Sequence, residues 1–306
     1  MLARLQQFIT LAALALAALW GVLCWNAGHE AWALLGVGLI VGGYSVVLAL
    51  EFVFLRQAHG DDPTPRASGL QLLRAWWGEV RSAPLVFCWR QPFFSQRFST
   101  TLQASSGQRG VLLIHGFFCN RGLWNRWQAG LSQHGVPVIA LNLEPIFGDI
   151  DDYRPAIDQA ITQLHQATGL APVVVAHSMG GLALRAWWAQ VKGDNRVHHA
   201  ITLGTPHHGT WLARFALTRN AQQMRRASRW LLALAASEPA GRAGRFTCFY
   251  SHSDNIVFPP TTATLPGANN RHLPGVAHVH MVEHPEPWNE LLRWINAPGQ
   301  PSSRLH

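Results

Sequence analysis

The chain has 306 residues, of which 48% are hydrophobic and only 13% are charged. Such a low charged fraction suggests that part of the surface faces something other than water. The formal net charge is +8, but the arginines are scattered and no nucleic-acid-binding motif is present, so we expect no nucleic-acid partner. The four cysteines form no CxxC pair, which indicates neither a disulfide framework nor a zinc knuckle.

Two apolar segments open the chain, at residues 8–25 and 31–50. Each has about the 20 residues needed to cross a bilayer. Only residues 26–30 separate them, so residues 1–56 are predicted to form an antiparallel transmembrane hairpin, in which the GxxxG spacing of Gly38 and Gly42 lets the two backbones approach closely. The alternatives are a signal peptide for the first segment and a buried core helix for the second.

Arginines indicate the orientation of this hairpin. Arg4 precedes the first segment, Arg56, Arg66, Arg74 and Arg81 follow the second, and the turn between the segments has no Lys or Arg. Positive residues favour the cytoplasmic side, where anionic lipid head groups attract them. We therefore predict a multi-pass protein of the bacterial inner membrane, with the part of the chain that follows the hairpin on the cytoplasmic side.

Residues 57–109 follow as a linker and an aromatic, arginine-rich pre-domain. The stretch AHGDDPTPR (58–66) is polar and contains proline, as is typical of a linker. The remainder, with RAWWGEV and FCWRQPFF, lacks clean periodicity. We expect it to pack on the domain that follows or to lie at the membrane interface, where Trp and Arg are common.

From residue 110 to 298 the pattern is that of an α/β fold. Short apolar runs at 111–114, 136–141, 173–176, 200–203 and 246–250 alternate with segments of helical character. Strands that are apolar on both faces indicate a mostly parallel sheet with helices on both sides. Within the insertion 209–245, helical spacing of Met224, Ala227, Trp230, Leu231 and Leu234 predicts an amphipathic helix, either a lid or an ordinary packed helix.

Ser178 stands where a strand meets a helix. The stretch Ala176-His177-Ser178-Met179-Gly180 matches the G-x-S-x-G elbow with Ala in place of the first Gly. Small residues there let the strand and helix pack closely, while a strained turn presents the serine hydroxyl at the edge of the sheet. This placement predicts a nucleophile.

A serine nucleophile needs a base and a carboxylate that orients the base. Asp254 follows the strand 246–250, and His278 comes after another short strand-like stretch, which gives the chain order of Ser-Asp-His hydrolases. The rival carboxylates Asp149, Asp151 and Asp152 lie in FGDIDDY, which is typical of a loop and helix cap. His280 shares a face with His278 on an extended segment, so local geometry excludes neither.

The sequence resembles the α/β-hydrolase superfamily, and within it the bacterial lipase and esterase group with an AHSMGG elbow. The resemblance runs from about residue 110 to 296 through LLIHGF, AHSMGG, TLGTPHHGT, SDNIVFPP and GVAHVHM. It implies Ser178 as nucleophile, Asp254 as acid and His278 as base, with the backbone N–H groups of Phe117 and Met179 as oxyanion donors and no cofactor. Residues 1–109 lie outside it.

The predicted function is cleavage of carboxylic esters, of a lipid or another hydrophobic acyl substrate, through an acyl-enzyme. Acyl transfer by the same triad to an alcohol or thiol is one alternative, and a catalytically silent membrane-anchored scaffold is another. The histidines His278, His280 and His284 and the pair His207-His208 have metal-like spacing, but no matching carboxylates or thiolates are evident, so no metal is expected.

Overall fold

A six-stranded sheet lies at the centre of the structure, a computed structural model that describes residues 1–100, 102, 107–191 and 195–296. All neighbouring strands are parallel and their order is β2-β1-β3-β4-β5-β6. The strands are β1 (Val111–Ile114), β2 (Val138–Ala140), β3 (Val173–His177), β4 (His199–Leu203), β5 (Phe246–Tyr250) and β6 (Asn269–His272). The predicted parallel sheet is confirmed. The predicted end of the α/β domain, residue 298, lies outside the described residues.

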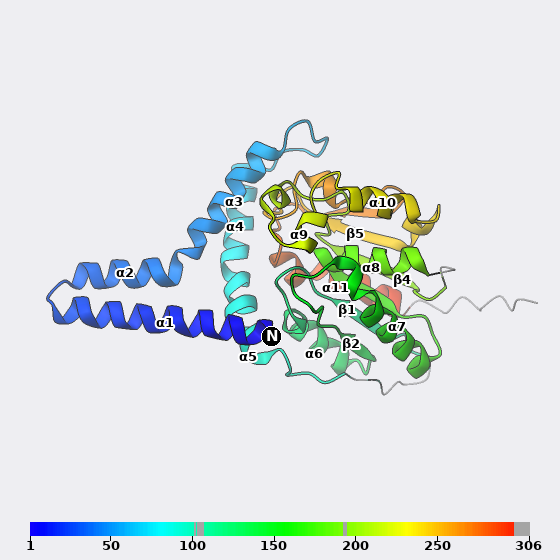
Figure 1. Ribbon diagram of the computed structural model, residues 1–306, viewed down its shortest axis with the longest axis horizontal. Helices are drawn as coiled ribbons and strands as arrows, with labels where there is room; N and C mark the ends of the chain where they lie inside the picture. Colours follow the sequence, from blue (N-terminus) through cyan, green and yellow to red (C-terminus); the bar gives the residue numbers. More distant parts are fainter. Residues whose placement is uncertain (101, 103–106, 192–194, 297–306) are drawn as a thin grey trace, which may run out of the picture.

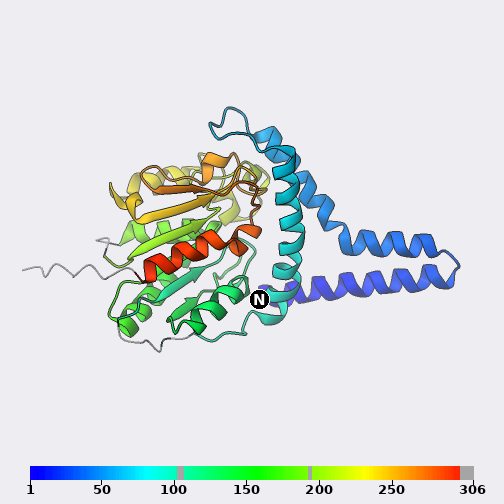
Figure 2. The ribbon, with the colours of Figure 1, turned by 180° about the vertical axis from the view of Figure 1, so that it is seen from behind.

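Helices cover both faces of this sheet, because alternate residues of each strand point to opposite sides. Val174 and Ala176 of β3 join the apolar cluster on one side, with α7 (Arg154–Thr168) and α8 (Met179–Gln190). Val173 and Val175 join the cluster on the other side, with α6 (Asn125–Gln133) and α11 (Pro285–Ile295). Figure 2 shows α11 in red on this second face. The fully buried strands explain the apolar runs in the sequence.

The insertion 209–245 differs from its prediction. Instead of one amphipathic helix it contains α9 (Arg219–Gln223) and α10 (Arg229–Ser237), separated by a turn at Ala227, whose φ is 53°. Leu231 and Leu234 of α10 are buried in the cluster that contains α8. The continuous helix was therefore a wrong prediction, and the alternative of ordinary packing fits α10.

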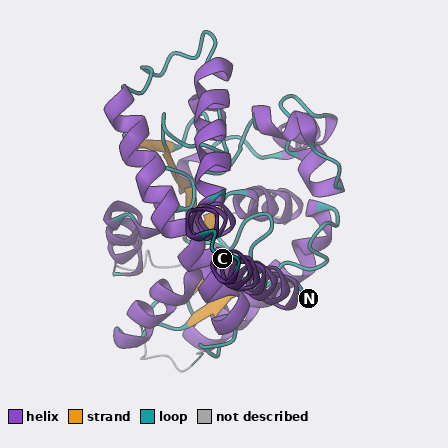
Figure 3. Ribbon diagram, turned by 90° about the vertical axis from the view of Figure 1, so that its left-hand side faces the viewer, coloured by secondary structure: helices purple, strands orange, loops and turns teal. Residues whose placement is uncertain are grey.

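Two helices project from the body as an N-terminal arm, which consists of α1 (Leu2–Asn26) and α2 (Glu30–Gly42) lying side by side (Figure 1). Figure 3 looks along this arm toward the body. Among the described residues, α1 is long and apolar enough to cross a membrane: its 25 residues extend about 37 Å. The second predicted segment is interrupted, because α2 ends at Gly42 and α3 (Tyr44–Ala58) continues at an angle of 52°.

Glycines shape the arm differently from the prediction. A Cβ at Gly38 or Gly42 would meet no atom within 4 Å, so the predicted close contact at these positions is wrong. The close approach is at Gly36, where a Cβ would overlap the indole of Trp20. The bend follows the Gly42-Gly43 pair, since glycine destabilises a helix interior and kinks commonly lie at such sites.

Helix α4 (Gly69–Pro84) connects the arm to the body. It begins with a capping box of Ser68 and Gln71 and lies across the end of the body that faces the arm (Figures 1 and 2). Leu72, Ala75, Glu79 and Ser82 form its buried face at intervals of three and four residues. A π-helical stretch (Leu85–Arg90) and α5 (Gln91–Phe94) complete the segment. The predicted pre-domain thus packs on the body.

Candidate active site

Ser178 occupies the junction of β3 and α8 with φ 54° and ψ −130°, a conformation that is strained for a residue with a side chain. Its N–H donates to the carbonyl of Leu203 at 2.8 Å, and its carbonyl accepts from Thr205 Oγ1 at 2.9 Å. Gly180 permits this turn: a Cβ there would lie 2.7 Å from the carbonyl oxygen of Ile114. The tight packing of α8 on β1 thus holds the serine in place.

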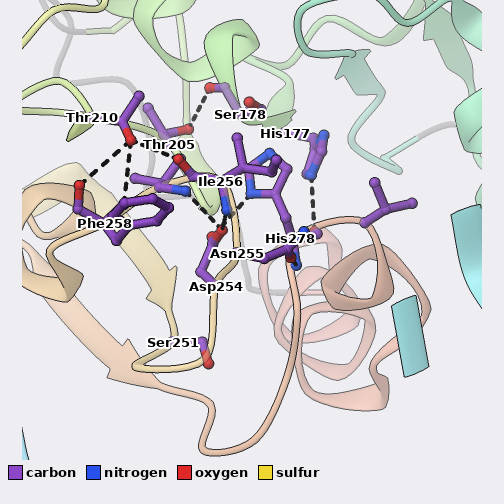
Figure 4. Close-up of polar contacts among 12 residues, drawn as sticks. His177, Ser178, Thr205, Thr210, Ser251, Asp254, Asn255, Ile256, Phe258 and His278 are labelled. Atoms are coloured by element: carbon purple, nitrogen blue, oxygen red, sulfur yellow. Dashed lines mark hydrogen bonds and ion pairs between the residues drawn. The ribbon is translucent and has the colours of Figure 1, made fainter. Parts of the chain in front are cut away.

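His278 and Asp254 form a buried pair at the same edge of the sheet (Figure 4). The Nδ1 of His278 lies 2.9 Å from Oδ2 of Asp254, and Asp254 is fully buried. The other carboxylate oxygen, Oδ1, accepts from the N–H groups of Ile256 and Val257 at 2.9 and 2.8 Å. Because a carboxylate can only accept, the hydrogen bond places the proton on Nδ1 of His278 and leaves Nε2 as the basic nitrogen.

The surroundings of His278 favour its protonated form. Burial opposes the charge, but the negative charge of Asp254 and its hydrogen bond, together with the carboxylates of Glu79 and Glu51, raise the pKa of the imidazole above its usual 6.5. A base that gains a proton readily is suited to deprotonate a hydroxyl.

Ser178 and His278 line one cavity of about 630 Å³. Within the described chain no hydrogen bond joins the Ser178 hydroxyl to the imidazole. In enzymes without substrate such contacts are often long and tighten only when the substrate binds. The structure thus brings Ser178, His278 and Asp254 to one site, in which the described residues show no hydrogen bond between the Ser178 hydroxyl and the His278 imidazole.

The rival residues lie elsewhere. His280 sits in a 3₁₀ turn (His280–Glu283) rather than on an extended segment, so the expected shared face with His278 was wrong. Its ring lies against Gly78 of α4, where a Cβ would come within 2.3 Å of Nδ1. Asp149 and Asp152 form the capping box of a 3₁₀ turn, and Asp151 pairs with Arg154, which agrees with the predicted loop and cap.

The two predicted oxyanion donors are the backbone N–H groups of Met179 and Phe117, which follow β3 and β1. Met179 is the first residue of α8, where N–H groups have no partner within the helix and the helix dipole favours negative charge. Phe117 follows β1 in a turn, and its N–H donates to no group of the described residues. Phe117 and Ser178 line the same cavity.

His115, which the sequence analysis left without a role, holds the Phe117 loop in place. Its Nδ1 donates to the carbonyl of Gly116 at 2.9 Å, and its Nε2 accepts from the N–H of Leu143 at 3.0 Å. Burial lowers the pKa of His115 to about 4, so the ring stays neutral and can serve as donor and acceptor at once. The HG pair in LLIHGF was the available signal.

His177 supports His278 from the other side. Its Nε2 donates to the carbonyl of His278 at 3.1 Å, and the two ring centres are 4.6 Å apart. Burial, and then the charge of His278, keep the pKa of His177 well below its usual value. A neutral His177 thus fixes the backbone of His278 without competing for its proton.

The N-terminal helices also hold the His278 loop. The N–H of His278 donates to Asn255 Oδ1 at 3.1 Å, and Asn255 Nδ2 donates to Glu51 Oε2 on α3 at 2.6 Å. The N–H groups of Val279 and His280 donate to Glu79 of α4. Three consecutive amides are thus bound by side chains. Neither glutamate stands in a motif, so sequence reasoning missed both.

Two of the histidines with metal-like spacing, His207 and His284, have structural partners. His207 lies in the turn of TPHHGT as predicted, and its Nε2 lies 3.1 Å from Thr202 Oγ1. His284 caps α11 by accepting from the N–H of Glu286. Across the described residues, no group of three His, Cys, Asp or Glu side chains is arranged to hold a metal ion.

Comparison with known proteins identifies the fold. Residues 110–254 match the family model described as "alpha/beta hydrolase fold". Among proteins of curated function no sequence match is found. The solved structures that resemble this chain include mature Bacillus licheniformis lipase BlEst2, with 15% identity, a TM-score of 0.55, and coverage of 63% of this chain and 96% of the lipase.

Aspergillus fumigatus lipase B is a second similar structure, with 23% identity, a TM-score of 0.51, and coverage of 65% of this chain and 56% of that lipase. At these identities the likeness concerns the fold alone. The sheet topology, the family match and these lipase structures together identify the chain as a protein of the α/β-hydrolase fold.

Proposed function

We propose that this protein is a membrane-anchored serine hydrolase that cleaves carboxylic esters of a hydrophobic substrate. The observation that carries the proposal is the buried His278–Asp254 pair beside Ser178 in one cavity. Nucleophile, base and orienting carboxylate are the groups that ester cleavage requires, and this chemistry needs no cofactor.

In the proposed mechanism, His278 Nε2 takes the proton of the Ser178 hydroxyl as its oxygen attacks the ester carbonyl. The N–H groups of Phe117 and Met179 stabilise the resulting oxyanion, each by about 3–4 kcal/mol. The protonated imidazole then donates to the leaving alcohol, which leaves an acyl-enzyme. Water, deprotonated by the same histidine, releases the acid and frees Ser178.

The arm supports membrane anchoring. Large apolar side chains such as Leu11, Leu19, Leu34 and Leu39 are more than half exposed on α1 and α2, which would be unfavourable in water. The α1 side chain of Gln6 donates to Gln91 Oε1 at 2.9 Å, a contact with the body that favours a retained helix over a cleaved signal peptide. We place the body on the cytoplasmic side of a bacterial inner membrane, as the arginine distribution predicts.

Labelling with a fluorophosphonate tests the catalytic part of this proposal. The full chain in detergent should react at one residue, Ser178, as identified by mass spectrometry of the labelled peptide, and should hydrolyse nitrophenyl esters. Ser178→Ala should abolish both activities with an unchanged circular dichroism spectrum. A native protein that neither labels at Ser178 nor hydrolyses any ester would be a silent scaffold. Added alcohol or thiol acceptors that divert the acyl group would indicate acyl transfer.

Topology is tested separately. A C-terminal fusion to a reporter that functions only in the periplasm should be inactive, and a cytoplasmic reporter at the same position should be active. The opposite pair of results would reverse the proposed orientation without affecting the assignment of Ser178.

A further inference from the structure

We propose that the N-terminal helices α1, α3 and α4 form the acyl-chain site of the enzyme, and that a lipid ester enters this site directly from the bilayer. The inference rests on the proposed function and specifies its substrate as a membrane-resident ester with a long acyl chain. It concerns residues outside the segment that matches the hydrolase family.

The walls of the active-site cavity come largely from the N-terminal helices. Ile9, Ala13 and Leu14 of α1, Val47 and Leu48 of α3, and Ala83 of α4 line it. Ser178 and His278 lie in the same cavity. An acyl chain bound between these helices would therefore extend to the Ser178 hydroxyl. The volume of about 630 Å³ is within the range of sites that enclose a small organic ligand.

The bend between α2 and α3 creates this space. Up to Gly42, α2 lies along α1; beyond Gly43, α3 diverges by 52° and reaches α4 (Figure 1). The three helices α1, α3 and α4 thus enclose a fork, and the cavity lies within it. A continuous second helix would have stayed against α1 and closed the fork.

The charges in the cavity favour an acyl chain over a polar head group. Among the described residues that line it there is no Lys or Arg, so a phosphate would find no cationic partner in that lining. Its two carboxylates, Glu51 and Glu79, are already bound to Asn255 and to the amides of residues 279 and 280. The remaining lining is mostly apolar, which suits hydrocarbon.

The surface around the fork suits a bilayer. Leu70, Leu73 and Trp77 of α4 are more than half exposed, on the side of the helix opposite its buried face. An exposed apolar row with Trp and with Arg74 and Arg81 nearby is typical of a helix that lies in a membrane interface. With the arm inserted, the fork meets the hydrocarbon region, so an acyl chain moves from lipid to cavity without crossing water.

Alkyl fluorophosphonates of different chain length test the inference, because the alkyl group takes the place of the acyl chain. The full chain in detergent should react with a dodecyl reagent at least about tenfold faster than with an ethyl reagent, since each buried methylene favours binding. Val47→Trp, which fills the cavity, should lower the dodecyl rate about tenfold more than it lowers the ethyl rate.

Val46→Trp is the matched control. Val46 and Val47 are neighbours on α3 and are 59% and 58% exposed, but only Val47 lines the cavity. Val46→Trp should leave both rates within about twofold of the wild type. On α1, Ala13→Trp and the adjacent Ala12→Trp form a second pair with the same expected contrast, because only Ala13 lines the cavity.

The outcomes separate the two proposals. If the wild type does not react with the ethyl reagent at Ser178, the proposed function fails. If the wild type reacts, but chain length has no effect or both members of each variant pair behave alike, the proposed function stands and the acyl-chain site is wrong. Equal loss of ethyl and dodecyl rates in Val47→Trp and Ala13→Trp would also overturn the inference, because it would indicate a disturbed triad.

Discussion

The carboxylate of Glu79 accepts hydrogen bonds from the backbone N–H of Val279, at 3.0 and 3.1 Å, although the two residues are 200 positions apart. Val279 directly follows His278, and the same carboxylate binds the N–H of His280 at 2.9 Å. Glu79 is 2% exposed, and burial raises its pKa to about 6. A buried carboxylate is costly unless it is fully bound, so α4 and the histidine loop are energetically coupled.

Glu79→Gln tests whether this contact positions His278. The amide oxygen can accept, but the NH₂ group faces N–H donors, so we expect the loop to shift and kcat/KM to fall by about 10–100-fold. Removal of the nearby negative charge should also lower the pKa of His278 and move the acid limb of the pH profile to lower pH. The exposed Glu30, at the start of α2, provides the control Glu30→Gln. A lower kcat/KM with an unmoved acid limb would indicate a purely structural role.

The wild-type pH profile follows from the pKa of His278. To act as the proposed base, the imidazole must be neutral, and its pKa is raised above 6.5. Activity should therefore increase as pH rises through that value and should fall about tenfold for each unit below it. Protonation of Glu79 near pH 6 weakens the loop contacts and should steepen the acid limb. Measurement of kcat/KM from pH 5 to 9 checks this, and an acid limb centred well below 6.5 would contradict it.

Asp254→Asn should leave the fold intact and abolish most of the activity. If the asparagine NH₂ group donates to Nδ1, the imidazole is held in the wrong tautomer. If the amide oxygen accepts from Nδ1, no negative charge stabilises the imidazolium. In either case we expect kcat to fall by about 10³–10⁴-fold. Asp149→Asn is the matched control, because Asp149 is a rival carboxylate from the sequence and asparagine also caps helices. Hydrolysis of a short nitrophenyl ester by both variants shows which aspartate orients the histidine. Loss of activity in the Asp149 variant alone would assign this role to Asp149.

The roles of the two histidines of GVAHVHM, His278 and His280, can be distinguished by the same kind of substitution. His278→Gln removes the proposed base and should reduce kcat by at least about 10³-fold. His280→Gln should retain activity within about threefold, because the His280 ring packs against Gly78 and forms no described bond to Asp254. Fluorophosphonate labelling rates provide a second readout that does not depend on substrate turnover.

The sequence predicts the body of this protein well, because each prediction there rests on local patterns. Runs apolar on both faces identify β1, β3, β4 and β5, and the elbow at Ser178 needs only its neighbours. The order of Ser178, Asp254 and His278 then places three groups at one edge, since parallel strands end on the same side.

The parts that the sequence did not predict depend on contacts between distant segments. Glu51 and Glu79 stand in helices without motifs, and their importance arises only where they meet Asn255 and the amides of residues 279 and 280. The bend at Gly43 was also missed, because apolar composition does not distinguish a straight span from a bent one. The break at Ala227 shows that helical spacing can continue through a turn.

Gly204→Ala should disturb the Asp254–His278 pair through a single methyl group. Gly204 has φ +55°, and a Cβ there would lie 2.8 Å from Asp254 Oδ2 and 3.0 Å from His278 Nδ1. Asp254 cannot move away easily, because its other oxygen is held by two N–H groups. We expect kcat to fall by about 10–100-fold, and the backbone conformation alone to cost about 1 kcal/mol of stability.

Gly169→Ala separates these two effects. Gly169 has φ +70° at the end of α7, and a Cβ there would meet no atom within 4 Å, so this variant carries the backbone cost without the contact. Both variants should lose similar thermal stability, but only Gly204→Ala should lose activity. Equal activity in the two would show that the pair tolerates the methyl group, and the close packing of Gly204 would then have no role in orienting His278.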